Sequence, residues 1–270
     1  MANCIPPVTT VLLTPDRLPP RLQAAGWKRD VYVRGPLPEG PTVAIVGARA
    51  ASQLGMDRAH AVAKHLTARG VHVVSGGALG IDGAAHRGAL AAGGTTTVVL
   101  GHGPDLVYPT RHARLFQQVI AAGGALASMW PDGTAPHRGM FLRRNELIAT
   151  LADAVIVIEA DVRSGSLSTA AAGKRLGRMI AAWPGSRGCE RLLAAGAAFV
   201  ESAADAELVV RGTPRPVTAA CLDPVAQQVR DAIEAGASGI DAIVRHTGLA
   251  VRAVLRALPQ IEHSCRARKP

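Results

Sequence analysis

The fold is decided by residues 42–86, TVAIVGARAASQLGMDRAHAVAKHLTARGVHVVSGGALGIDGAAH. An apolar run at 43–46 ends at Gly47, apolar residues then recur at helical spacing, and a second apolar run covers 71–74. This order predicts a strand, a helix and a second strand, with each strand ending in a turn that contains glycine. In a parallel sheet such turns meet at the carboxyl edge, where backbone N–H groups and helix N-termini favour an anionic ligand.

The first turn lacks the sequences that bind common nucleotide cofactors. The tripeptide at 47–49, Gly-Ala-Arg, has no second glycine as in G-x-G-x-x-G, and Ser75 ends the second strand where that motif leads to an acidic residue. The ATP loop is absent too, because Ser168 and Arg175 stand where it needs its first Gly and its final Ser or Thr. We therefore expect no cofactor. The turn instead offers Arg49, a planar five-donor group that suits phosphate.

The composition favours a folded protein with an anionic partner. The chain has 270 residues, of which 48% are hydrophobic, and this is enough for one large domain and a small one. Thirty Lys and Arg against twenty Asp and Glu give a formal net charge of +10. Such a charge favours a polyanion such as nucleic acid. A genome of high G+C content, which favours arginine codons, would give the same excess of basic residues. The charge alone therefore leaves both interpretations open.

The cysteines and the start of the chain indicate a cytoplasmic protein. Cys4, Cys189, Cys221 and Cys265 are scattered and follow no zinc or disulfide pattern, so we expect no metal site. The first residues show no basic segment followed by an apolar core, and no apolar run approaches the length of a membrane span. We therefore expect no membrane partner.

Strands alternate with helices through most of the chain. This alternation over residues 41–212 predicts an α/β domain with a doubly wound parallel sheet. Residues 1–40 are rich in Pro and lack sustained periodicity, and we expect them to form a lead-in that packs on this domain. Beyond the opening unit, strands are expected at 96–100, from 125, and at 154–159, 179–183 and 198–200, and helices at 84–92, 111–122, from 143, and at 168–177 and 189–195.

A second, smaller domain is expected after the sheet. Residues 213–220 contain two prolines and are interpreted as a linker. Within 221–262, apolar residues from Val225 to Ile233 follow helical spacing, and two short helices are expected after them. This predicts a small all-α, winged-helix-like domain, although a three-helix protein-contact domain fits the same pattern. Residues 263–270 are expected to form a disordered basic tail.

Four loops that follow the expected strands carry the candidate binding residues. Arg49 is the phosphate donor of the first loop, and Ser52 is expected to cap the next helix. Gly76 and Gly77 would let a ligand approach the backbone of the second loop. The third and fourth loops add Arg138, Phe141, Arg143, Arg144, Asn145, Gly165, Ser166, Thr169 and Lys174.

The third and fourth loops suit a site that neutralises phosphates and stacks a base. Three arginines surround Phe141, and this mixture is typical of single-strand binding sites. By spacing alone, Phe141 also fits a helix start whose ring fills the core, so both interpretations stay open. Residues 164–169 combine a glycine with hydroxyls and could form a phosphate nest, with Lys174 on the following helix. Asp82 and His86 fit a helix cap and a packed helix residue better than a catalytic pair.

Short motifs recur in order, at suitable spacing, over roughly residues 30–210. They are GAR (47–49), SGGALGIDGAAH (75–86), GG-T-T-T-V (93–98), YP (108–109), FLRRN-x-L-I (141–148), SGSLSTA (164–170), GR (177–178), PG (184–185) and GA (196–197). This ordered set resembles the bacterial DNA-processing protein A family, also called Smf. The chain departs from the family pattern at Ala48, Met129, Glu146 and Glu190.

The resemblance implies an extended Rossmann-like fold that binds single-stranded DNA without catalysis. It further implies a homodimer that protects DNA taken up in natural transformation and loads a RecA-type recombinase. A winged-helix-like C-terminal module is common in the family. By the same resemblance, Arg49 grips phosphate, the segment with Phe141, Arg143 and Asn145 contacts bases, and the pocket is lined by Gly76, Gly77, Gly165 and Thr169.

Two other functions compete with DNA binding. Related Rossmann-like enzymes cleave the N-glycosidic bond of nucleoside monophosphates, but their P-G-G-x-G-T motif is missing, since Ser186 and Arg187 follow Pro184 and Gly185. A sequence-specific transcription factor acting through residues 220–262 is the other candidate. The short polar tail leaves little sequence for a wing hairpin, and this weakens that interpretation.

Overall fold

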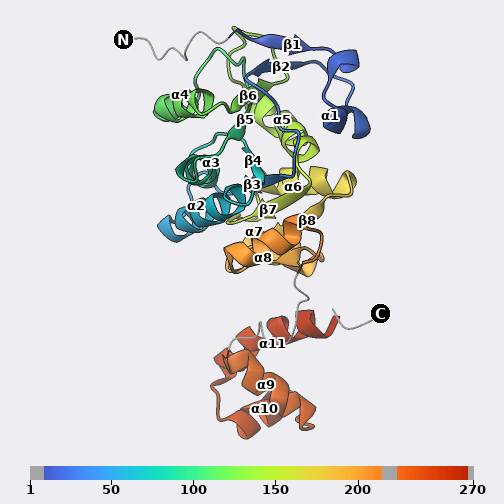
Figure 1. Cartoon of the computed structure of the whole chain (residues 1–270). Helices are drawn as coiled ribbons and strands as arrows, with labels where there is room; N and C mark the ends of the chain where they lie inside the picture. Colours follow the sequence, from blue (N-terminus) through green and yellow to red (C-terminus); the bar gives the residue numbers. More distant parts are fainter. Residues whose placement is uncertain (1–8, 215–223, 267–270) are drawn as a thin grey trace. The chain divides into compact units, whose positions relative to one another are not determined.

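The computed structural model describes residues 9–214 and 224–266. These residues form two compact units, and the division between them falls between Arg215 and Pro216 (Figure 1). Most of the expected linker at 213–220 lies outside the described residues.

A nine-stranded sheet organises the first unit. The strands lie in the order β1-β2-β6-β5-β4-β3-β7-β8-β9, and every neighbouring pair from β6 to β9 is parallel. The predicted doubly wound parallel sheet is therefore confirmed. The strands are β1 Val11–Leu13, β2 Val31–Arg34, β3 Thr42–Val46, β4 His72–Ser75, β5 Thr96–Leu100, β6 Ala125–Ser128, β7 Ala154–Val157, β8 Met179–Ala182 and β9 Ala198–Phe199.

Helices cover both faces of this sheet. Apolar side chains of α2, α3 and α8 pack with one set of strand residues, and those of α5, α6 and α7 pack with the other set. The fully buried runs of β3, β5 and β7 follow from this double cover. The helices are α1 Pro20–Ala24, α2 Gln53–Thr67, α3 Ile81–Ala91, α4 Ala113–Ala121, α5 Arg138–Leu151, α6 Ser166–Arg175, α7 Arg187–Ala194 and α8 Ala203–Val210, with 3-10 turns at Pro15–Arg17 and Thr110–His112.

The lead-in contributes strands as well as packing. β1 pairs with β2, and β2 pairs with β6, both antiparallel, so part of the lead-in extends the sheet at one edge. Leu18, Leu22 and Trp27 of this segment are buried in the same core as α5. The sequence analysis expected a lead-in that packs on the main domain and did not predict these two strands. Strands of three and four residues are too short to produce a detectable alternation.

The second unit consists of three helices in its described residues. These are α9 Pro224–Glu234, α10 Ile240–Thr247 and α11 Val251–Arg266, and Val229, Ile243 and Val254 are among their shared core residues. α11 was expected to end near residue 258 and instead continues to Arg266, so residues 263–266 are helical and not a disordered tail. Residues 267–270 lie outside the described part.

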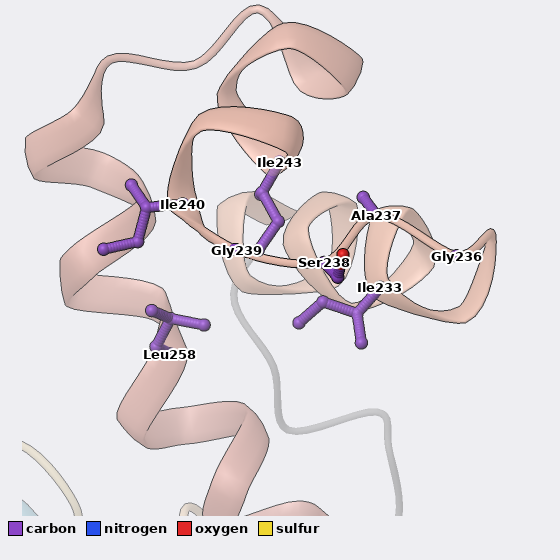
Figure 2. A pocket seen from close by; sticks show the side chains of 8 residues that line it. All are labelled: Ile233, Gly236, Ala237, Ser238, Gly239, Ile240, Ile243 and Leu258. Atoms are coloured by element: carbon purple, nitrogen blue, oxygen red, sulfur yellow. The ribbon is translucent and has the colours of Figure 1, made fainter.

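An apolar cavity of about 490 Å³ lies within this second unit. Ile233, Ile240 and Leu258 point towards it from α9, α10 and α11 (Figure 2). Among the described residues, no helix is long and apolar enough to cross a membrane. Those residues also contain no group of three His, Cys, Asp or Glu side chains placed to hold a metal ion.

Truncation of Leu22 tests whether the lead-in belongs to the core. Leu22→Ala should lower the free energy of unfolding by about 2–5 kcal/mol, because the side chain is fully buried. Leu54→Ala is the matched control, since Leu54 is 57% exposed on α2, and it should change stability by less than about 0.5 kcal/mol. Urea unfolding followed by circular dichroism measures both. Equal small effects would mean that the lead-in is not part of the cooperative core.

Candidate functional site

The strand order of the sheet reverses between β3 and β7. In doubly wound sheets, ligands bind at such a point, outside the carboxyl ends of the strands. Three loops meet there: the Ala48 N–H donates to the Glu159 carbonyl at 2.7 Å, and the Ile81 N–H donates to the Ala48 carbonyl at 3.2 Å. A Cβ on Gly47 would lie 2.5 Å from Ile81 Cγ1, so glycine is needed for this close approach.

The N-terminus of α2 already holds an anion from the chain itself. Ser52 caps the helix as predicted, since its Oγ accepts the Gly55 N–H at 3.0 Å. The Ser52 N–H donates to Glu159 Oε1 at 3.0 Å, and its hydroxyl donates to Glu159 Oε2 at 2.5 Å. Both donors of Ser52 are therefore used internally, which corrects its assignment as a DNA contact. Glu159 was predicted only as the end of a strand.

The glycine-rich loop after β4 makes room for an internal cation. The Gly76 carbonyl accepts from Arg144 Nη1, and a Cβ on Gly76 would overlap the Arg144 guanidinium. Gly77 has φ +69°, and a Cβ there would lie 2.5 Å from Val98 Cγ1. Both glycines are buried. The structure therefore explains them by internal packing, whereas the sequence interpretation placed a ligand against them.

Arg144 is buried and was wrongly expected to contact DNA. Its side chain is buried with 4% residue exposure, its Nε donates to Asn145 Oδ1 at 2.9 Å, and Nη1 donates to the carbonyls of Gly76 and Val99. Nη2 lies 3.9 Å from Asp82 Oδ2. Burial lowers the pKa of Arg144 to about 10 while the Asp82 carboxylate opposes the shift, so the guanidinium is charged at neutral pH. Arg144 thus joins α5 to the loop after β4 and to strand β5.

Asn145 connects α5 to the start of α6. Its Nδ2 donates to the Gly165 carbonyl at 3.0 Å and to Ser168 Oγ at 2.7 Å. Ser166 and Thr169 are also buried, and the Ser166 hydroxyl lies 2.7 Å from that of Ser164. These groups hold the loop in shape. They are not free to bind a ligand as the sequence interpretation expected, whereas Gly165 and Lys174 are exposed.

The exposed part of the site centres on Phe141. The ring is half-buried and does not belong to the core, so the core-filling interpretation is not supported. Cζ of Arg49 lies 5.1 Å from the ring centroid, within the range of a cation–π contact. A Cβ on Gly101 would lie 2.7 Å from Phe141 Cδ1, so the ring rests on that backbone. The ring of Tyr108, which the sequence analysis noted only within the YP motif, lies 5.6 Å away.

The N-terminal part of α5 presents two further cations. The helix begins at Arg138, five residues before the expected start, and Arg138 and Arg143 are both exposed on it. A cavity of about 200 Å³ between α5 and α6 lies next to this segment, and Arg143 and Arg175 contribute to its walls. Arg175 was not among the predicted site residues. Its position at the end of a helix gave no sequence signal.

Two departures from the family pattern contact the same arginine. Arg29 Nη2 pairs with Glu146 Oε2 at 2.6 Å, and its Nη1 lies 3.6 Å from Met129 Sδ. The Arg29 guanidinium also lies 5.0 Å from the Trp27 ring centroid. The acidic Glu146 on α5 is therefore paired, and it does not stand beside the exposed cations as an isolated negative charge.

The acid and base that the sequence analysis weighed as a catalytic pair are both inaccessible. Asp82 is buried; burial raises its pKa and the Arg144 cation opposes that shift. His86 is fully buried, its Nδ1 lies 2.8 Å from Thr96 Oγ1, and burial lowers its pKa to about 3. Neither side chain can take a proton from a bound substrate in this arrangement.

Replacing Arg144 tests its role inside the protein. Arg144→Met should lower the free energy of unfolding by about 3–5 kcal/mol, because Asp82 would keep a buried charge without its partner. Adding Asp82→Asn should restore part of that loss. Arg143→Met, the exposed neighbour on the same helix, is the control and should change stability by less than about 0.5 kcal/mol. Chemical denaturation of the three variants decides: similar losses for Arg144→Met and Arg143→Met would contradict the assignment.

Comparison with known proteins agrees with this geometry. Residues 13–209 match the family described as DNA recombination-mediator protein A, and residues 213–262 match the DprA winged helix domain. The DNA processing protein DprA of Mycobacterium tuberculosis is 43% identical over 236 residues, which cover 81% of this chain. The chain spans 60% of the length of that relative.

Two solved structures share the fold. DprA from Streptococcus pneumoniae superimposes with a TM-score of 0.66 at 34% identity, covering 75% of this chain and 74% of that one. DNA processing protein A from Helicobacter pylori gives a TM-score of 0.65 at 26% identity, covering 77% and 97%. The family match covers most of the chain and extends into the second unit, and the chain therefore belongs to the DprA/Smf family of DNA recombination-mediator proteins.

Proposed function

We propose that this protein binds single-stranded DNA through the exposed surface around Arg49 and Phe141, and that it does so without catalysis. One observation carries the proposal: a charged planar group lies against a half-exposed aromatic ring where the strand order reverses. Single-strand sites combine such cations for the phosphates with aromatic rings for the bases. The H. pylori relative has a described single-stranded DNA binding mode.

The proposed contacts follow from what is exposed. Backbone phosphates are attracted by the side chains of Arg49, Arg138, Arg143 and Lys174, and Phe141 stacks on a base. The backbone of Gly165 lies at the same edge and is open to the strand. The remaining predicted residues make internal hydrogen bonds or pack closely, and so hold the loops of the site in place. They are Ser52, Gly76, Gly77, Arg144, Asn145, Ser166 and Thr169.

The geometry does not favour the alternative of a nucleoside monophosphate hydrolase. Such an enzyme needs an acid or base within hydrogen-bonding reach of its substrate, and Asp82 and His86 are both buried. The α2 N-terminus, where a Rossmann-like fold would hold a phosphate, is taken by Glu159. An open surface that binds an extended DNA strand fits these observations better than a closed reaction pocket does.

The wider role is part of the same proposal and is supported by family membership. We assign DNA binding to the first unit, residues 41–212 and the strands of the lead-in, and a separate contact function to the module at 221–262. Protection of incoming DNA in natural transformation, transfer to a RecA-type recombinase, a homodimer and a cytoplasmic location all follow from the family. These proposals are supported by the family match over residues 13–209 and by the M. tuberculosis relative, which covers 81% of this chain.

Binding to single strands should exceed binding to duplex DNA and should weaken with salt. Phosphates supply the attraction, so the slope of log K against log salt should be about −0.7 for each phosphate contact. Fluorescence anisotropy with a labelled oligothymidylate and a duplex of equal length, each at several salt concentrations, measures both quantities. Equal or tighter binding to the duplex would contradict the proposal.

Arg49→Ala should weaken binding by about 1.5–3 kcal/mol, since one charge-assisted bond to phosphate is lost. The control is Arg69→Ala. Arg69 is exposed just beyond the C-terminal end of α2, the opposite end of the helix from Ser52, and at 1.5 Å per residue the two ends are roughly 22 Å apart. The same anisotropy titration applies to both variants, with a melting curve to confirm folding. Comparable losses would mean that diffuse charge, and not this site, attracts the DNA.

A further inference from the structure

Tyr108 is the most exposed aromatic residue of the protein. All eight Phe, Tyr and Trp residues lie in the described part of the chain, and Tyr108 exposes 45% of its surface while the others are buried or half-buried. Aromatic residues make up 3% of the sequence, so few rings are available for packing. Because 45% of its surface is exposed, Tyr108 adds less to stability by burial than a core ring would, and its exposed part is accessible to a ligand.

The position of the ring relates it to the proposed DNA site. The centroids of Tyr108 and Phe141 are 5.6 Å apart, and the ring planes differ by 35°. The two rings come from different segments: Tyr108 precedes the 3-10 turn at Thr110–His112, and Phe141 lies in the first turn of α5. Their separation exceeds the rise of about 3.4 Å per nucleotide along one strand of a duplex. Two successive bases can therefore stack on the two rings only if the DNA strand is locally extended.

The backbone that carries Tyr108 is fixed from the core. Nε2 of His102 lies 3.3 Å from the Tyr108 carbonyl oxygen, and the two rings meet edge to face with centroids 6.3 Å apart. His102 is buried, and the Ser128 hydroxyl at the end of β6 donates to its carbonyl at 2.6 Å. The Tyr108 ring is therefore presented on a held backbone, which reduces the entropy lost when a base stacks on it.

We propose that Tyr108 forms a second nucleobase subsite next to Phe141, and that the two rings accept successive bases of one extended single strand. This inference rests on the proposed function, because it adds a subsite to the same DNA surface. The ligand class is a nucleobase of any sequence, since every base offers a face for stacking. The phenol hydroxyl is not needed for stacking, so Phe should replace Tyr at this position.

The test compares a short oligothymidylate with an abasic strand of the same length. The two ligands carry the same phosphates, so the difference between their dissociation constants reports stacking alone. Wild type should bind oligothymidylate more tightly than the abasic strand. Tyr108→Ala should weaken oligothymidylate binding by roughly 5- to 150-fold and leave the abasic strand almost unchanged. Tyr108→Phe should bind both ligands like wild type, and melting curves confirm that each variant is folded.

The outcomes separate the subsite from the wider proposal. If Tyr108→Ala binds oligothymidylate as well as wild type does, or weakens both ligands equally, the subsite is contradicted while DNA binding stands. If wild type binds neither strand, the proposed function itself fails. Phe141→Ala serves as the reference, because it should lose affinity only for the strand that carries bases, and the double variant should approach the affinity of the abasic strand.

Discussion

The buried guanidinium of Arg144 is the interaction on which the site depends. Removing a cation from water is costly, and here the cost is offset by two backbone carbonyls, the Asn145 side chain and the nearby Asp82 carboxylate. These partners come from the loop after β4, from strand β5, and from α3 and α5. One side chain thereby fixes how α5 sits on the sheet, and with it the direction of Phe141 and Arg143. The glycine at position 76 is a condition of this arrangement.

Much of the fold could be predicted from the sequence. The strand at 96–100 was predicted with the bounds that the structure has, because a β-branched run between glycine-containing turns has few other interpretations. The strands β1 and β2 were missed, because they are short, form the edge strand and its neighbour, and expose part of their residues. Their pairing depends on β6, which is far away in the sequence and cannot be recognised from local pattern.

The site was predicted less well, and Arg144 shows why. Arg143 and Arg144 look equivalent in a loop, but on a helix they point in directions about 100° apart. Arg144 shares its face with Leu147, Ile148 and Leu151, at i+3, i+4 and i+7, all of which are buried. Because the helix begins at Arg138, helical periodicity places Arg144 on the buried face and Arg143 on the exposed one. Tyr108 and Glu159 follow strands in irregular loops, where no periodicity indicates which side chains turn outward.

The carboxylate of Glu159 at the start of α2 determines what a free nucleotide would meet at this turn. Related folds leave this helix end vacant for a phosphate that arrives from solution. Here the occupant is part of the polypeptide, is present at a fixed ratio of one per chain and cannot diffuse away. A mononucleotide therefore finds no empty helix terminus at this turn. The architecture keeps the shape of a nucleotide-binding fold while making this position indifferent to metabolite concentration.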